Sequence, residues 1–324
     1  MINFNTKFAI KIYLIALLIV ITTNAIGAEI CVKTPTSSLV VNVKSKGAKG
    51  NGTTDDTAAI QSAIDQVSGT GGTVWIPAGT YLIDAIVSIR IKKSMTLRMS
   101  KKTILKAIPN NKEGYNIIII KDTTNVNIID GTLLGDREVH SGVTGEWGMG
   151  ISLLNASSTS IIGVTVRNCW GDGFYISQKS KNIKICSVIA DNNRRQGMSI
   201  ISVDGMIVKN SVFKNTTGTA PQAGIDLEPN EGDTIRNVQL LNSKIMDNKG
   251  AGIMIFQKPQ HNIVNNITID GNIINNNYIG GIAIYNGAKH TIVNDQLNDE
   301  LGYGISLFSG TKGNKIIQNI ELVR

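Results

Sequence analysis

The chain has 324 residues and carries 32 Lys and Arg against 24 Asp and Glu, a formal net charge of +8 at pH 7. Hydrophobic residues make up 42% and charged residues 17%, which excludes an intrinsically disordered chain and indicates a packed protein. The basic balance favours an acidic partner. Three cysteines are too few for a disulfide framework or a zinc site.

The first residues have the three-part pattern of a secretory signal peptide. Lys7 and Lys11 precede an apolar run from Ile12 to Ile21, and small residues follow. An uncleaved anchor is disfavoured because the run is too short to cross a bilayer comfortably. We therefore expect residues 1–28 to be a signal peptide and residues 29–324 to be a secreted or periplasmic protein without stable membrane insertion.

An N-terminal segment, residues 39–81, combines strand patterns, a Gly-rich turn and one helical pattern. From Ala58 to Val67 apolar residues recur at helical spacing, directly after the acidic pair Asp55 and Asp56, which suits a helix start. The end of a stack of strands exposes its core and its unpaired edge. We expect this helix to cap that end.

A polar insertion from Glu138 to Gly148 then interrupts the strand pattern. Loops that leave a rigid scaffold commonly carry functional residues. His140, Glu146 and Trp147 are therefore candidates for substrate binding, and His140 also for carrying a proton. A surface loop without function is the alternative.

From Gly150 to Leu307 one phrase returns seven times: a Gly, an apolar residue, any residue and an apolar residue. It begins at Gly150, Gly173, Gly197, Gly224, Gly252, Gly281 and Gly304, with spacings, by subtraction, of 23, 24, 27, 28, 29 and 23. Such a period, with alternating apolar residues and Asn/Gly turns, is typical of a parallel β-solenoid with one coil per period. We expect regular coils over residues 150–324, stacked roughly 4.8 Å apart.

Within the phrase, alternation places the residues two and four positions after each Gly on the outside. The first outward column is Ser152, Tyr175, Ser199, Asp226, Met254, Ala283 and Ser306. The second is Leu154, Ser177, Ile201, Glu228, Phe256, Tyr285 and Phe308. A function on this face must reside in these columns or in the turn before them.

Asn recurs in the second half of several coils, at Asn168, Asn192, Asn215, Asn248 and Asn276. An Asn side chain inside a turn can bond the backbone of the neighbouring coil. We expect these residues to form a structural internal ladder.

The run from Gly47 to Tyr81, with Gly-Asn-Gly-Thr-Thr-Asp-Asp, Ala-Ile-Gln-Ser-Ala-Ile and Gly-Gly-Thr-Val-Trp-Ile-Pro-Ala-Gly-Thr-Tyr, resembles the pectate-lyase-like right-handed β-helix superfamily. That superfamily includes rhamnogalacturonases, polygalacturonases, alginate epimerases and phage tailspikes. With the coil repeats, the resemblance spans about residues 40–324. It implies an all-β fold, a single right-handed parallel β-helix with an N-terminal capping helix, and leaves the reaction open.

Asp226 and Glu228 point outward from one strand of the predicted coil. Two strand steps place their Cα atoms roughly 6.6 Å apart, within reach of the roughly 6.5 to 9.5 Å between the carboxyl groups of inverting glycosidases. One would act as acid and the other as water-activating base, because like charges this close separate their pKa values. Asp172, two coils earlier, is a third candidate catalytic carboxylate. A solvated acidic patch is the alternative.

Three residues before the phrase Gly, successive coils place Trp147, Trp170 and Arg194. Two indoles and a guanidinium, one coil apart, suit sugar rings and acidic groups. Tryptophans that merely cover the core at a turn are the alternative. The predicted substrate-binding set is Trp147, Trp170, Tyr175, Arg194, Arg195, Glu146, His140 and Glu231.

We expect an exported glycosidase that cleaves an acidic polysaccharide, pectin-like or bacterial, without cofactor or metal. The resemblance also implies a polysaccharide lyase or epimerase, with Ca²⁺ held through Asp226, Glu228 and Glu231 and with Arg194 or Arg195 as base. A non-catalytic carbohydrate-binding solenoid is the third hypothesis. The signal peptide disfavours a nucleic-acid partner.

Two family motifs are absent from the chain. These are the polygalacturonase set of Asn-Thr-Asp, Asp-Asp and Gly-His-Gly, whose only counterpart is Asp55-Asp56 in the cap, and the Asp-Pro-His-Glu of alginate epimerases, where the coil reads Gly173-Phe-Tyr-Ile-Ser-Gln. Both absences weaken these two specific assignments.

Overall fold

The described part of the computed structural model comprises Cys31 and residues 35–257, 263–286, 288–293, 295–298, 304–308, 314–317 and 320–321. The elements below all lie in the compact unit Pro35–Arg324. The predicted signal peptide lies outside the described residues. Within them, no helix has the length and apolar character needed to cross a membrane.

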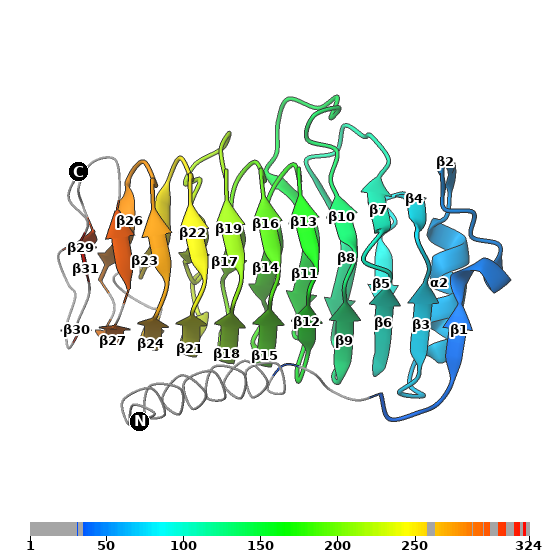
Figure 1. The fold of residues 1–324 in the computed structure, drawn as a ribbon, viewed down its shortest axis with the longest axis horizontal. Helices are drawn as coiled ribbons and strands as arrows, with labels where there is room; N and C mark the ends of the chain where they lie inside the picture. Colours follow the sequence, from blue (N-terminus) through cyan, green and yellow to red (C-terminus); the bar gives the residue numbers. More distant parts are fainter. Residues whose placement is uncertain are drawn as a thin grey trace, which may run out of the picture. The chain divides into compact units, whose positions relative to one another are not determined.

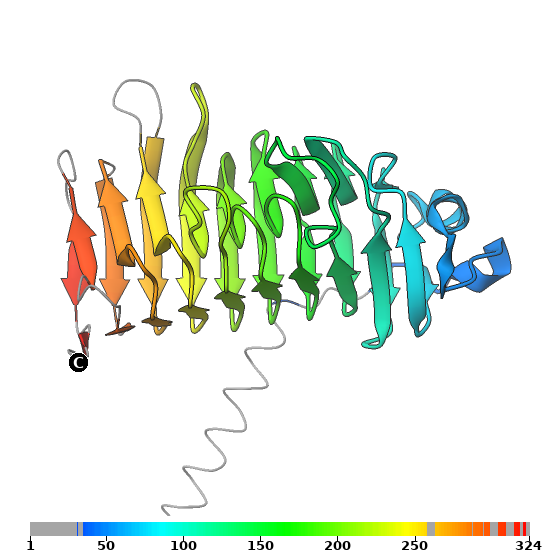
Figure 2. The ribbon, with the colours of Figure 1, turned by 90° about the horizontal axis from the view of Figure 1, so that it is seen from above.

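The chain winds through three parallel sheets, and successive coils lie side by side along the long axis (Figures 1 and 2). The first sheet carries the phrase strands. Among the described residues its members are β5 (Ile89–Ile91), β8 (Gly114–Lys121), β11 (Trp147–Leu154), β14 (Phe174–Ser177), β17 (Met198–Ile200), β20 (Ile225–Leu227), β23 (Ala251–Phe256), β26 (Gly280–Tyr285) and β29 (Ile305–Leu307). All-β architecture as a parallel β-helix is thereby confirmed.

The second and third sheets complete each coil. In the described part, the second contains β1 (Val40–Asn42), β3 (Thr73–Ile76), β6 (Met95–Met99), β9 (Val126–Ile129), β12 (Ser160–Ile162), β15 (Ser180–Cys186), β18 (Val203–Lys209), β21 (Thr234–Leu241), β24 (Ile263–Asp270), β27 (Ala288–Val293) and β30 (Lys315–Ile317). The third contains β2 (Asn51–Asp55), β4 (Gly79–Ile83), β7 (Thr103–Ala107), β10 (Thr132–Leu134), β13 (Thr165–Arg167), β16 (Ile189–Asp191), β19 (Val212–Lys214), β22 (Lys244–Met246), β25 (Ile273–Asn275), β28 (Gln296–Asn298) and β31 (Ile320–Glu321).

The register of the first sheet matches the predicted outward column. Tyr175 pairs with Ser152 and Ser199, and Asp226 pairs with Ser199 and Met254. The flanking residues of each phrase, such as Ile225 and Leu227, are fully buried in the core. The phrase therefore positions side chains as period-two alternation requires.

The phrase glycines are required by close backbone contact between coils. A Cβ atom on Gly197 would lie 2.4 Å from the carbonyl oxygen of Gly224, and one on Gly224 would lie 2.7 Å from that of Gly252. Backbone cannot move aside as a flexible side chain would. This contact explains why the repeat begins with Gly.

An internal ladder exists, but the predicted positions are mostly wrong. Asn193, Asn248 and Asn277 are buried, and Asn248 Oδ1 accepts a hydrogen bond from Thr216 N at 3.1 Å. Of the predicted residues only Asn248 belongs to this buried ladder. The others, Asn168, Asn192, Asn215 and Asn276, have positive φ angles and occupy the outer corner of the turn, where Asn tolerates the left-handed conformation.

The predicted capping helix is α2 (Thr57–Val67), preceded by the 3-10 helix η1 (Val43–Lys46). Its apolar face, including Ile60 and Ile64, is buried in the same core as the first strands, and α2 lies at the N-terminal end of the coils (Figure 1). Asp55 accepts a hydrogen bond from Thr57 N at 2.9 Å. Asp55 therefore supports the helix start, whereas the Asp56 side chain, at the N-cap, makes no capping bond and accepts from Lys49 N and Gly50 N instead.

We expect Asn248→Ala to lower the melting temperature measurably, because Thr216 N–H loses its buried acceptor. An orphaned buried donor costs about 1–3 kcal/mol. Thermal unfolding followed by circular dichroism measures the change, with Lys244→Ala, at an exposed position of the same coil, as control. Equal melting temperatures for the two variants would contradict a structural ladder.

Candidate functional site

Four carboxylates surround Arg195 on the outer side of the first sheet. We name Glu146, Asp172, Arg195, Asp226 and Glu228 the carboxylate cluster. Arg195 Nη1 donates to Asp172 Oδ2 at 3.2 Å, and Arg195 Nε lies 3.6 Å from Glu146 Oε2. Asp226 and Glu228 also act on the charge of Arg195. The coils of β11, β14, β17 and β20 thus converge on one cation.

Asp172 is held in place from two sides although it lies in a turn. Ser199, in β17, donates from Oγ to Asp172 Oδ2 at 2.7 Å. Arg195 completes the set, and Asp172 is fully buried. The orientation of Asp172, which strand alternation leaves open, is therefore toward the cluster.

Asp226 lies at the centre of β20 and is only 1% exposed. Gln196 Nε2 donates to Asp226 Oδ2 at 2.9 Å, and Gln196 Oε1 accepts a bond from Ala223 N at 2.7 Å. In the described part of the structure, Asp226 Oδ1 is buried without a hydrogen-bond partner. A carboxylate oxygen in that position favours the protonated form.

The members of the carboxylate cluster differ in how their pKa values are shifted. Burial, assisted by the charge of Glu228, raises the pKa of Asp226 well above its usual range. Burial also raises the pKa of Asp172 to about 6, although Arg195 and Ser199 act to lower it. Burial opposes the charge of Arg195, but the surrounding carboxylates, Asp172 first, raise its pKa. The site therefore joins a fixed cation to carboxyl groups that can hold a proton near neutral pH.

The alternative of a solvated acidic patch is wrong for Asp172 and Asp226, because both are buried. Glu228 lies one residue beyond β20 and is half-buried. Its backbone N–H donates to Ile200 O at 3.1 Å, which continues the pairing of β20 with β17. Glu231 is exposed in the following turn. Among the described residues, no group of three or more His, Cys, Asp or Glu is arranged to hold a metal ion.

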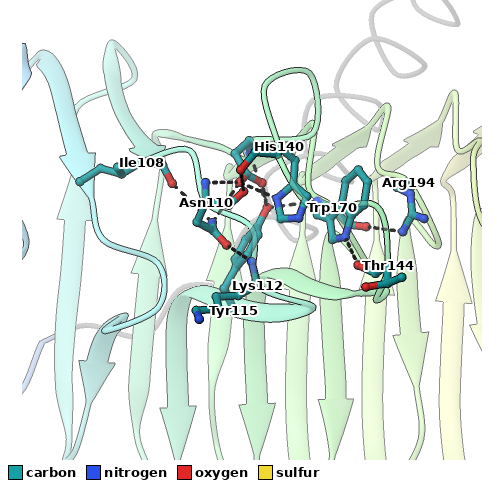
Figure 3. Close-up of polar contacts among 10 residues, drawn as sticks. Ile108, Asn110, Lys112, Tyr115, His140, Thr144, Trp170 and Arg194 are labelled. Carbon is teal, nitrogen blue, oxygen red and sulfur yellow. Dashed lines mark hydrogen bonds and ion pairs between the residues drawn. The ribbon is translucent and has the colours of Figure 1, made fainter.

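Trp170 lies between His140 and Arg194 (Figure 3). The imidazole stacks on the indole with ring centroids 4.0 Å apart, and the Arg194 guanidinium carbon lies 3.8 Å from the centroid of the Trp170 ring. The sequence prediction placed Trp170 and Arg194 in adjacent coils, and they do meet. Because two side chains cover the indole, it offers an edge rather than a face to a sugar ring.

The side chain of His140 is buried, in contrast to the exposed loop side chain that its position suggested. Its Nδ1 lies 2.8 Å from Asp136 Oδ2, and Tyr115 Oη donates to Asp136 Oδ1 at 2.6 Å. Asp136 and Tyr115 were missed by sequence reasoning. The four-residue spacing of Asp136 and His140 was the available signal. This network fastens the loop after β10, which rises above the neighbouring coils (Figure 1).

Two further predicted residues, Trp147 and Tyr175, keep part of their surface exposed. Trp147 begins β11 and is 52% exposed. Tyr175, in β14, is half-buried, and burial raises its pKa. Gln196 and Ser199 were not predicted as site residues, although Ser199 stood in the first outward column. Trp147 is thus the predicted aromatic side chain that remains accessible.

Comparisons place this chain among known proteins. The family model described as "Right handed beta helix region" matches residues 87–240 and 149–320. An uncharacterized protein, YclG, from Bacillus subtilis (strain 168) is 29% identical over 73% of this chain and 49% of its own length. Mannuronan C5-epimerase AlgE5 from Azotobacter vinelandii is 28% identical over 71% of this chain, which covers 24% of that protein.

Among solved structures, the A-module of mannuronan C-5 epimerase AlgE6 from Azotobacter vinelandii superposes with a TM-score of 0.75 at 22% identity, over 86% of this chain and 75% of that one. At this identity the likeness concerns the fold. The chain spans about half the length of YclG and about a quarter of AlgE5. The family model covers most of the coils, and the chain belongs to the family of proteins with a right-handed β-helix region.

Proposed function

We propose that this protein is an exported glycosidase that cleaves an acidic polysaccharide with Asp226 as general acid and Glu228 as general base. The observation that carries the proposal is the buried Asp226 carboxyl, whose pKa burial and Glu228 raise. A carboxyl group that stays protonated beside a second carboxylate has the division of roles that glycoside hydrolysis requires. Similarity to a mannuronan C5-epimerase supports a polysaccharide as the substrate class.

In this mechanism Asp226 donates its proton to the glycosidic oxygen while Glu228 takes a proton from the attacking water. The bond from Gln196 occupies Asp226 Oδ2, so the proton to be donated resides on Oδ1. Arg195 lies among the carboxylates and compensates the charge of its ion-pair partners Asp172 and Glu146. Asp172 and Ser199 fix the Arg195 side chain. Because Asp226 is 1% exposed, substrate binding has to move some of the side chains that bury it.

A lyase or epimerase is the second candidate, favoured by the 28% identity to AlgE5. Both reactions remove a proton next to a carboxylate group, and Arg195 would stabilise the resulting charge. A lyase produces unsaturated sugars that absorb ultraviolet light, whereas a hydrolase produces reducing ends without that absorbance. These two products distinguish a hydrolase from a lyase, whereas an epimerase forms neither of them.

We expect Asp226→Asn and Glu228→Gln each to lower the release of reducing ends from an acidic polysaccharide by at least about 100-fold, the usual contribution of a general acid or base. The assay follows reducing ends and ultraviolet absorbance together. Asp65→Asn, an isosteric change on α2 remote from the cluster, is the control. Unchanged rates in both cluster variants would exclude the proposed pair, and absorbance in the wild type would select the lyase.

The pH dependence of kcat/KM should report Asp226, which must be protonated, as a loss of rate on the alkaline side. Arg195 lowers the pKa of Asp226, so Arg195→Gln should move this limb to higher pH, while Arg195→Lys, which keeps the charge, should leave it near its wild-type position. A shift to lower pH in Arg195→Gln would contradict the assignment of Asp226 as acid.

The raised pKa of Asp172 predicts how the stability of the protein depends on pH. In the folded protein this pKa is about 6, above the ordinary value of about 3.9. Its contribution to stability is present below about pH 4 and is lost as pH rises to about 6, a loss of about 3 kcal/mol. Asp172→Asn cannot ionise, but it also loses the ion pair with Arg195, so its melting temperature relative to wild type should be higher at pH 8 than at pH 4. Thermal unfolding at both pH values tests this, with Asp65→Asn as control. The same difference from wild type at both pH values would refute it.

A further inference from the structure

A pocket of about 200 Å³ lies where strands of the first sheet turn into the second sheet. We name it the basic pocket. Its walls include Lys179 before β15, Ser202 between β17 and β18, and Gly232 before β21. It therefore borders the same coils that carry Asp172, Ser199 and Asp226, on the other side of one turn.

The charge of the basic pocket is positive. Lys179, Lys181 and Arg236 line it against one carboxylate, Asp204. The register places Lys181, Asp204 and Arg236 next to one another on successive strands. Asp204 is already engaged, because Arg236 Nη2 lies 2.9 Å from Oδ2 and Asn237 Nδ2 donates to Oδ1 at 2.7 Å. Lys181 also acts on the charge of Asp204, so three cations face one carboxylate and the pocket keeps an excess of positive charge.

Ser202 supplies a second, independent observation. It is 1% exposed, and in the described part of the structure its Oγ is buried without a hydrogen-bond partner. Buried hydroxyl groups are normally paired because leaving them unpaired is unfavourable. A ligand oxygen entering the pocket would give this hydroxyl an acceptor.

We propose that the basic pocket binds an oxyanion of the substrate, a carboxylate or sulfate group on a sugar next to the one that is cleaved. This inference rests on the proposed function for the identity of the ligand as a polysaccharide. Ser202 follows Ser199 by three residues, so their Cα atoms are at most about 11 Å apart. This spacing is within the range of neighbouring sugars of one chain, so the pocket would make the protein selective for acidic chains.

Affinity electrophoresis of the full chain tests the pocket without requiring turnover. The gels contain polygalacturonate, which carries carboxylates, ι-carrageenan, which carries sulfates, or neutral dextran. We expect wild type to be retarded by at least one acidic polymer and not by dextran. The double variant Lys179→Gln/Lys181→Gln should bind about tenfold more weakly, since hydrogen bonds to charged groups are lost. Ser202→Ala should weaken binding in the same direction.

The matched control is Lys101→Gln/Lys102→Gln, which removes the same charge from two exposed lysines between β6 and β7. Three outcomes would each refute oxyanion binding at the basic pocket. These are an equal loss of retardation in the two double variants, retardation by dextran equal to that by the acidic polymers, and no retardation of wild type by either acidic polymer. Which polymer retards wild type identifies the oxyanion as carboxylate or sulfate. Lysine-dependent retardation without any product formed supports the pocket and refutes the proposed catalysis, so the two failures are distinguishable.

Discussion

The close approach of glycine backbones between neighbouring coils is the constraint on which the rest of the structure depends. Where Gly197 faces the Gly224 carbonyl, no side chain fits, so the register that brings glycine to this contact is favoured. A shift by one residue would turn Ile225 outward and Asp226 into the core. The same contact that closes the coils therefore decides which side chains face the cluster.

The carboxylate cluster is assembled across coils and not along one strand. Glu146, Asp172, Arg195 and Asp226 come from four successive periods, and Arg195 is the member that contacts or polarises the others. Their burial makes their mutual charges effective, because screening by water is reduced. The cluster is consequently costly to the fold, as sites with a chemical role often are.

The sequence predicted those parts of the fold that follow from periodicity. The phrase and its alternation yield the outward column from Ser152 to Ser306, because strand geometry alone determines it. The ladder position failed by one residue at Asn192 and Asn193, since adjacent amides occupy the outer and inner side of one turn and spacing cannot distinguish them. The burial of Asp226 also escaped prediction, because Gln196, which covers it, lies a full coil earlier. Likewise Trp170 was expected to be open, and only the fold of the loop after β10 brings His140 onto its ring.

Gln196 has a consequence for how the site could change over evolution. One amide joins the Asp226 carboxyl to the backbone N–H of Ala223, so a turn of variable length is tied to a strand of fixed length. Residues can be inserted into such a turn without disturbing the stacked backbone, yet each insertion would shift the amide and, with it, the proton affinity of Asp226. Changes in the turn can thus alter the pKa of Asp226, while the stacked strands beneath it stay the same.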